Sequence, residues 1–178
     1  MTGVQTCALP ISLNLDDDDI VVVVQGDEPL VHPDMIDLAI QPLLNEDDVF
    51  VSNLTAELTK EEWKDPGEIK VVCDLKMNAM YMSRAPMPSI DHEEVRAKWY
   101  KQVCIMPFRW HFMKKFNHTL EPTPLELQES IEMNRAIQHG YKVRMVHSPY
   151  LSKSVDTEAD RKMVEKIMRT DPIFQKYE

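Results

Sequence analysis

Two aspartates of this chain stand where an α/β protein could hold a divalent metal ion. Asp27 follows the apolar run Ile20–Val24 after Gly26, and Asp156 immediately precedes a helix start signal at Thr157. Open α/β sheets bind ligands outside the carboxyl ends of their strands, and the helix dipole favours the charged form of a carboxylate near a helix N-terminus. Carboxylate oxygens are preferred ligands of Mg²⁺. The two aspartates therefore predict a magnesium site, provided that folding brings them together.

Both aspartates also have a purely structural interpretation. Asp27 and its neighbour Glu28 could simply end a strand and begin a turn. Asp156 could do no more than assist the start of the helix that follows it. The two residues alone do not decide between a metal site and these structural roles.

The elements that must position the aspartates alternate along the chain. The unbroken β-branched run 20–24 predicts a strand covered on both faces, as in the middle of a parallel sheet. Further strands are expected over 49–54, 69–73, 79–83, 101–108 and 141–147, and the spacing of 69–73 and 79–83 suits a hairpin. An amphipathic helix is expected to begin at Pro33, and a short one at Arg109. This alternation predicts an α/β fold.

Two later helices carry their own capping signals. Thr123 and Glu126 form a capping box, and Gly140 supplies a stop, so one continuous helix is expected over 123–139. Its apolar residues fall on two sides, which predicts a helix wedged between other elements. The last helix is expected to begin at Thr157, with Asp160 three residues later.

Composition excludes several classes of function. The 178-residue chain has 20 basic and 30 acidic residues, a formal net charge of −10, which disfavours binding to nucleic acid. Three widely spaced cysteines indicate reduced thiols and a cytoplasmic location. No apolar run is long enough to predict a membrane span. The glycines do not cluster into a phosphate-binding loop.

Five motifs in order carry a resemblance to a known family. They are VQGDEPL at 24–30, DPGEIKVV at 65–72, AMYMSRAPMPS at 79–89, TPLELQESIEMNRAIQHGYKV at 123–143 and SVDTEAD at 154–160. With these motifs the chain resembles, from about residue 19 to 169, the 3-deoxy-manno-octulosonate cytidylyltransferases, or CMP-Kdo synthetases. The resemblance implies a Rossmann-like nucleotidyltransferase sheet with flanking helices and a small β-hairpin subregion.

The resemblance also implies a reaction and its partners. The family joins the anomeric hydroxyl of an acidic sugar to the α-phosphate of CTP and releases pyrophosphate, using Mg²⁺. Asp27 and Asp156 match the two metal-binding, catalytic aspartates of the family. Family members commonly form homodimers, so a homodimer is possible here as well.

Four further residues match the sugar-binding positions of the family. Arg84 falls where the family contacts the acidic sugar, and a guanidinium suits a carboxylate because two parallel hydrogen bonds can form. Glu132 matches a glutamate that bonds sugar hydroxyls, and Gln25 would line the same crevice. Gln102 stands where the Kdo enzymes usually carry a histidine, and Met133 replaces a glutamine. These two departures leave open a related ulosonic or nonulosonic acid, as in the CMP-sialic-acid synthetases.

Arg84 and Glu132 also have purely structural interpretations, in which neither residue binds a ligand. Arg84 could belong to a surface ion pair, and Glu132 could be the solvated partner of Arg135 or Gln128 on the outside of a helix.

The beginning of the chain departs most from the family pattern. The family opens with a basic, nucleotide-gripping loop, which is not found in this sequence. Residues 1–12 instead resemble a translated sequencing adapter, and we expect them to be non-native. Residues 13–178 are then expected to be the C-terminal portion of a cytidylyltransferase domain that misses its first βα elements. Such a fragment would be inactive alone, because it has no CTP-binding N-terminus. A second hypothesis is a non-catalytic α/β module that binds an acidic ligand.

Overall fold

The computed structural model describes residues 14–89 and 98–176. The segment 1–12, which we expect to be non-native, lies outside the described residues. The elements are β1 (Ile20–Val24), α2 (Pro33–Asn45), β2 (Val51–Glu57), α3 (Lys60–Lys64), β3 (Lys70–Cys73), β4 (Ala79–Ser83), β5 (Tyr100–Val103), β6 (Ile105–Arg109), α4 (Trp110–His118), α5 (Pro124–Glu129), α6 (Met133–Gln138), β7 (Val143–His147), α7 (Glu158–Met168) and the 3₁₀ turn η1 (Phe174–Lys176).

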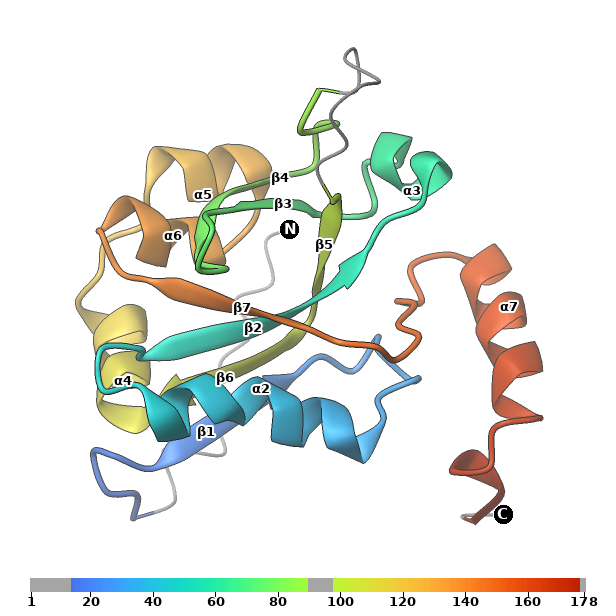
Figure 1. Cartoon of the computed structure of the whole chain (residues 1–178), viewed down its shortest axis with the longest axis horizontal. Helices are drawn as coiled ribbons and strands as arrows, with labels where there is room; N and C mark the ends of the chain where they lie inside the picture. Colours follow the sequence, from blue (N-terminus) through green and yellow to red (C-terminus); the bar gives the residue numbers. More distant parts are fainter. Residues whose placement is uncertain (1–13, 90–97, 177–178) are drawn as a thin grey trace.

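Strand β2 lies at the centre of a seven-stranded mixed sheet (Figure 1). On one side β2 pairs in parallel with β7, and on the other it pairs antiparallel with β5 and β6. The antiparallel neighbours continue outward, since β1 pairs with β6 while β3 pairs with β5 and with β4. The predicted α/β class and the predicted hairpin of β3 and β4 are therefore confirmed.

The prediction that residues 20–24 form a strand inside a parallel sheet is wrong. β1 pairs antiparallel with β6 and has no second strand neighbour among the described residues, and its side chains are mostly half-buried. A run of β-branched residues favours the extended backbone, but the partners of a strand are set by segments far away in the sequence. The run therefore predicted the strand correctly and its place in the sheet incorrectly.

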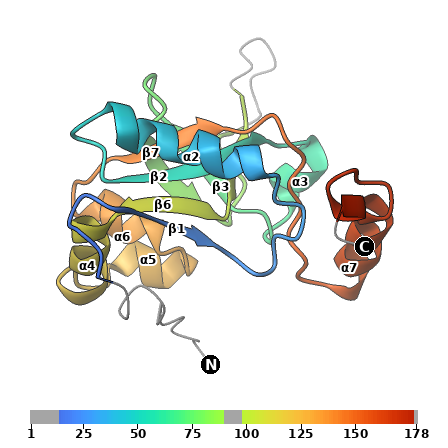
Figure 2. The ribbon, with the colours of Figure 1, turned by 90° about the horizontal axis from the view of Figure 1, so that it is seen from below.

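Helices cover both faces of the sheet (Figure 2). Helix α2 packs on one face through Met35, Ala39 and Leu43, which are buried. It begins as expected, with Pro33 in the first turn and His32 as the N-cap. Helices α4, α5 and α6 lie on the other face, where a larger apolar core forms around the phenylalanines of β6 and α4.

The strand expected over residues 101–108 is divided into β5 and β6 at Cys104. The backbone carbonyl of Cys104 accepts a hydrogen bond from Gln25 N (3.2 Å), and its N–H donates to Glu28 Oε1 (3.4 Å). On the other side of this break, Gln102 N donates to the carbonyl of Ile69 (2.8 Å). The sheet therefore forks at Cys104, with β1 following β6 and β3 following β5.

The continuous helix expected over 123–139 is also wrong, because the chain breaks it into α5 and α6. Ser130 adopts a left-handed conformation, with φ 55° and ψ 47°. We attribute the end of α5 at this point to Glu129, because its carboxylate accepts hydrogen bonds from Tyr81 Oη (2.7 Å) and Ser83 Oγ (2.7 Å) of β4 and so ties the chain to that strand. Thr123 is the N-cap as expected, with Glu126 Oε2 accepting from Thr123 N (3.2 Å), and the stop at Gly140, which has φ 81°, is confirmed.

Helix α7 lies at one end of the molecule, beyond the ends of the strands (Figure 1). Its expected start is confirmed, since Thr157 Oγ1 accepts from Asp160 N (3.2 Å) and Asp160 Oδ2 accepts from Thr157 N (3.0 Å). Among the helices of the described ranges, none is long and apolar enough to cross a membrane.

Candidate active site

Two adjoining cavities open at the fork of the sheet. The first, of about 190 Å³, reaches from the end of β1 to the loop before α7 and is lined by Asp27 and Asp156. The second, of about 260 Å³, reaches toward the start of α6 and is lined by Glu132. We call them the aspartate cavity and the Glu132 cavity. Their shared lining consists of Gln25, Ile69, Arg84, Gln102 and Cys104. All six residues predicted from the sequence therefore line one continuous region.

The loops that carry the two aspartates are joined by a backbone hydrogen bond. Val155 N donates to the carbonyl of Asp27 at 2.9 Å, so residues far apart in sequence lie side by side. Both aspartate side chains are exposed, and Asp156 Oδ2 accepts from Ser154 Oγ (3.1 Å). Thr157 supplies the helix cap, so Asp156 does not act as the cap of α7.

Arg84 makes three hydrogen bonds, two through its side chain and one through its backbone, and forms no ion pair with any of the described residues. Its Nε donates to the carbonyl of Glu129 (3.2 Å), and its Nη1 donates to the carbonyl of Pro66 (3.2 Å). Its backbone N–H donates to Glu129 Oε2 (2.9 Å). The guanidinium bonds of Arg84 go to neutral carbonyls and leave further N–H groups, so Arg84 can still pair with an anionic ligand in either cavity, although the nearby carboxylate of Glu129 offsets part of its charge.

Glu132 and Gln102 approach the Glu132 cavity from different elements. Glu132 stands at the exposed start of α6, and its carboxylate has no hydrogen-bond partner among the described residues. Arg135 binds the carboxylate of Glu126 instead, with a distance of 2.7 Å from Nε to Oε2. Glu132 therefore makes no hydrogen bond to Arg135 among the described residues, although its charge adds to the rise in the pKa of Arg135 that the Glu126 hydrogen bond causes. Gln102 projects from β5 and donates through Nε2 to Asn53 Oδ1 (2.6 Å).

Comparison with known proteins identifies the family. The family model described as cytidylyltransferase matches residues 5–173. The chain belongs to the cytidylyltransferase family. Two of its relatives are named 3-deoxy-manno-octulosonate cytidylyltransferase. The relative from Geobacter metallireducens is 36% identical, and the match covers 86% of this chain and 65% of the relative. The relative from Geobacter sulfurreducens is 37% identical, and the match covers 84% of this chain and 64% of the relative. The resemblance that the motifs predicted is confirmed.

Solved structures agree with this assignment. A CMP:2-keto-3-deoxy-manno-octonic acid synthetase complexed with CTP superposes with a TM-score of 0.77 and 28% identity, covering 85% of this chain and 62% of that protein. A putative glucose-1-phosphate thymidylyltransferase from Bacillus anthracis shares the fold alone, with a TM-score of 0.53 and 14% identity. This match covers 86% of this chain and 56% of that protein. The chain spans less than two thirds of the length of these curated relatives.

The region of the two cavities also contains buried and half-buried charges that sequence reasoning missed. Lys101 Nζ binds Glu62 (2.7 Å) and Glu68 (3.2 Å), and Lys153 Nζ binds Glu68 (3.0 Å). Lys70 is fully buried and donates to backbone carbonyls. The available signal was the presence of lysine inside otherwise apolar strands, at positions 70 and 101. A buried lysine must be paired or hydrogen-bonded, so such positions indicate a polar network.

Burial changes the acidity of two groups in the aspartate cavity. It raises the pKa of the Glu28 carboxyl, although hydrogen bonds from Cys104 N and Ser152 Oγ oppose the rise. It also raises the pKa of the Cys104 thiol to about 12, with further increases from the charges of Glu28, Asp27 and Asp156. A thiol with this pKa is not a nucleophile at neutral pH. Cys104 is therefore not a candidate nucleophile in this cavity.

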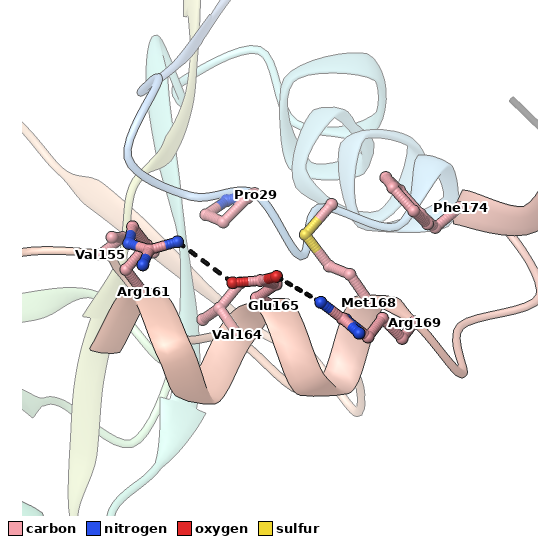
Figure 3. A pocket seen from close by; sticks show the side chains of 8 residues that line it. All are labelled: Pro29, Val155, Arg161, Val164, Glu165, Met168, Arg169 and Phe174. Atoms are coloured by element: carbon pink, nitrogen blue, oxygen red, sulfur yellow. Dashed lines mark hydrogen bonds and ion pairs between the residues drawn. The ribbon is translucent and has the colours of Figure 1, made fainter. Parts of the chain in front are cut away.

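A larger cavity, of about 510 Å³, lies between α7 and the loop after β1 (Figure 3). Its lining is largely apolar, with Pro29, Val164 and Met168 among its residues. The arginines seen in Figure 3 are already paired, since Arg161 and Arg169 both bind Glu165, at 3.1 and 2.6 Å. Among the described residues that line this cavity, none is a predicted site residue and none carries an unpaired charge that would attract an ionic ligand.

Proposed function

We propose that this chain carries the acidic-sugar and metal-binding part of an enzyme that transfers CMP from CTP to 3-deoxy-manno-octulosonate (Kdo) or a related ulosonic acid. The observation that carries the proposal is the convergence of Asp27, Asp156, Arg84 and Glu132 on two adjoining cavities at one fork of the sheet. The names of the curated relatives support Kdo over sialic acid as the sugar.

The chemistry requires one bond to form and one to break. The anomeric hydroxyl oxygen of the sugar attacks the α-phosphorus of CTP, the bond from this phosphorus to the bridging oxygen breaks, and pyrophosphate leaves. The hydroxyl proton passes to solvent or to a nearby oxygen. Because neither substrate needs a covalent enzyme intermediate, the task of the protein is to position the two substrates and to offset their charge.

Arg84 suits the carboxylate of the sugar. Its guanidinium is fixed by Glu129 and Pro66 and keeps further N–H groups for a ligand. Glu132 and Gln102 also line the Glu132 cavity and suit sugar hydroxyls, while Gln25 lines both cavities. The sugar would thus lie with its carboxylate at Arg84 and its hydroxyl groups toward α6.

Asp27 and Asp156 would hold the metal ion, for which Mg²⁺ is the proposed identity. No group of three or more histidine, cysteine or acidic side chains within 14–89 and 98–176 forms a ready metal cage. Two exposed carboxylates in one cavity fit Mg²⁺, because this ion is usually held by one or two carboxylates together with substrate phosphates and waters. When bound, the ion would supply positive charge against the triphosphate.

The experiment is an assay of pyrophosphate release from CTP and a sugar acid in the presence of Mg²⁺. The enzyme is this chain, alone and as a chimera preceded by the N-terminal part of the Geobacter metallireducens relative. We propose that the chain alone is inactive and that the chimera is active. A panel containing Kdo and sialic acid identifies the sugar, and failure of every sugar acid in the chimera would disprove the proposed function.

The roles of the two aspartates are tested in the same chimera. Asp27→Asn and Asp156→Asn are each expected to lower kcat by about a hundredfold or more, the usual range for removing one charged group that acts in a transition state. Asp37→Asn, at an exposed position of α2, is the matched control and should leave kcat unchanged. Full activity of both active-site variants would disprove their role as metal ligands. Sugar binding that persists in both variants without any activity in the chimera would favour a non-catalytic module. A homodimer and a cytoplasmic location remain predictions.

A further inference from the structure

Gln102 presents only one of its two polar ends to the Glu132 cavity. Its Nε2 donates to Asn53 Oδ1 at 2.6 Å and lies 3.7 Å from the sulfur of Met106. A side-chain amide has two N–H donors and one carbonyl acceptor. Both donors are therefore directed toward protein atoms, and the carbonyl oxygen Oε1 has no hydrogen-bond partner among the described residues.

The free oxygen of Gln102 is not sealed inside the protein. Among the described residues, the one buried side-chain oxygen or nitrogen without a partner is Thr123 Oγ1. Gln102 is half-buried and lines both cavities. Its Oε1 is thus the atom that a ligand in these cavities can reach.

Asn53 fixes the orientation of the Gln102 side-chain amide. It lies on β2, is completely buried, and donates through Nδ2 to the carbonyls of Val103 (2.6 Å) and Leu54 (3.1 Å). Because carbonyl oxygens only accept hydrogen bonds, Asn53 cannot turn its own oxygen toward them without leaving them unpaired. Asn53 Oδ1 must therefore face Gln102, and Gln102 must donate a hydrogen bond to it through an N–H of its amide.

We propose that Asn53 is a positioning residue that locks Gln102 as a hydrogen-bond acceptor and so makes it a specificity-determining residue for the acidic sugar. The cavity then requires a hydrogen-bond donor, a sugar hydroxyl, at the position facing Gln102 Oε1. This inference rests on the proposed function, because it concerns the ligand of the same site.

The lock also orients the sugar. The oxygen of Gln102 and the carboxylate of Glu132 both repel the carboxylate of an acidic ligand, whereas Arg84 attracts it. A histidine at position 102, as the resemblance to the Kdo enzymes leads us to expect, could donate or accept according to its tautomer. Gln102 held by Asn53 has no such freedom, and it therefore rejects a ligand that lacks the hydroxyl donor.

The first test measures the binding of Kdo and of analogues in which each hydroxyl in turn is replaced by fluorine, using calorimetry on the full chain. Fluorine keeps the size of the group but removes its donor. We expect one position at which fluorine weakens binding about tenfold, the usual effect of losing one hydrogen bond. In Gln102→Leu, Kdo itself should bind about tenfold more weakly, and the discrimination at this position should disappear. Gln128→Leu, at an exposed position of α5, is the matched control.

Variants of Asn53 separate positioning from mere packing. Asn53→Asp loses the donor to Val103 and Leu54 and should be less stable, but it keeps an oxygen that accepts from Gln102, so the folded variant should retain the discrimination between hydroxyl and fluorine. Asn53→Leu removes that acceptor, so the Gln102 amide can rotate, and the discrimination should fall to about onefold while the affinity for the fluoro analogue recovers. Equal discrimination in Asn53→Leu and the wild type would overturn the positioning role. If Asn53→Leu does not fold, loss of discrimination in a folded Asn53→Asp would overturn it equally.

The second test uses the protein without any ligand. In a ¹⁵N spectrum, the side-chain amide of Gln102, assigned by its absence in Gln102→Leu, should exchange its protons with water far more slowly than that of Gln128. Exchange as fast as that of Gln128, or Kdo binding that no fluorine substitution affects, would overturn the inference. A protected Gln102 amide in a protein that binds no sugar acid would instead overturn the proposed function, and with it the sugar specificity assigned to Gln102.

Discussion

Lys70 is expected to stabilise both the fold and the site, because its buried ammonium group holds three backbone carbonyls at once. Nζ donates to the carbonyls of Glu68 (2.8 Å) and Arg84 (2.8 Å), and also to that of Asp65. The side chain is completely buried. Lys70 thereby ties the 65–68 loop, which supplies Pro66 to Arg84, to the end of β4.

The substitution Lys70→Met keeps the length and the apolar stem of the side chain but leaves the three carbonyls without their donor. Each unpaired carbonyl costs about 1–3 kcal/mol when it stays buried. Removing the buried charge returns part of this cost, since an ammonium group is expensive to desolvate. Taking the low value for each carbonyl, we expect a loss of about 3 kcal/mol in the free energy of unfolding. For a domain of this size, such a loss lowers Tm by roughly 6–12 °C.

Urea unfolding followed by circular dichroism measures this change, with Lys76→Met as the matched control. Lys76 lies at an exposed position of the turn between β3 and β4, and its side chain has no partner among the described residues, so its replacement should change stability by less than about 0.5 kcal/mol. An equal effect of the two substitutions, or a loss below about 1 kcal/mol for Lys70→Met, would refute the reasoning. Because Lys70 also holds the Arg84 backbone, Lys70→Met should weaken the binding of the sugar acid as well.

Two further predictions follow from the buried groups of the aspartate cavity. The raised pKa of Glu28 means that the folded state binds more protons than the unfolded state at intermediate pH, so stability is lost as pH rises from the unfolded pKa through the folded one. Glu28→Gln should therefore be more stable than the wild type at pH 7 and lose this advantage at pH 4. Urea midpoints that shift equally at both pH values would contradict this prediction. Burial raises the pKa of Cys104 to about 12 and that of Cys73 to about 11, so neither thiol should react with iodoacetamide within an hour at pH 7.5 in the folded protein. Peptide mapping by mass spectrometry measures the alkylation of each cysteine. If Cys104 is alkylated as fast in the folded protein as in the protein unfolded by urea, the prediction is wrong and the cavity is open to the reagent.

Local signals in the sequence predicted most of the elements because they act over a few residues. The caps at Thr123 and Thr157, the proline start of α2 and the glycine stop at Gly140 all appear as expected. Each depends on contacts within one helical turn, which the residue types decide almost alone. The hairpin of β3 and β4 is likewise local.

The failed predictions all depend on partners that are distant in sequence. The place of β1 at the sheet edge follows from its pairing with β6, in which Val21 lies opposite Phe108, 87 residues later in the sequence. The break at Ser130 follows from Glu129, which bonds to Tyr81 and Ser83 on β4. Local helix propensity favoured continuity there, and the tertiary hydrogen bonds overrode it.

The site residues were predictable only because several motifs pointed to one reaction. Taken singly, Asp27 and Arg84 had structural alternatives that the sequence could not dismiss. The lining of the two cavities brings these two residues together with Asp156 and Glu132, as the motif order implied. The locked amide of Gln102 could not be predicted, because it depends on Asn53, which the sheet places beside Gln102 from 49 residues away.

The charge distribution bears on how an acidic protein would bind the two anionic substrates proposed for it. The net charge of −10 repels both CTP and a sugar acid at long range. Beneath the site, Lys101 and Lys153 are already bound to Glu68, and Lys101 also to Glu62, so these lysines offer little free positive charge to a ligand. The aspartate cavity is therefore negative unless a cation enters it, and Arg84 is the free guanidinium charge of the lining that the structure describes. Triphosphate binding should thus require the divalent ion, whereas sugar binding should require Arg84.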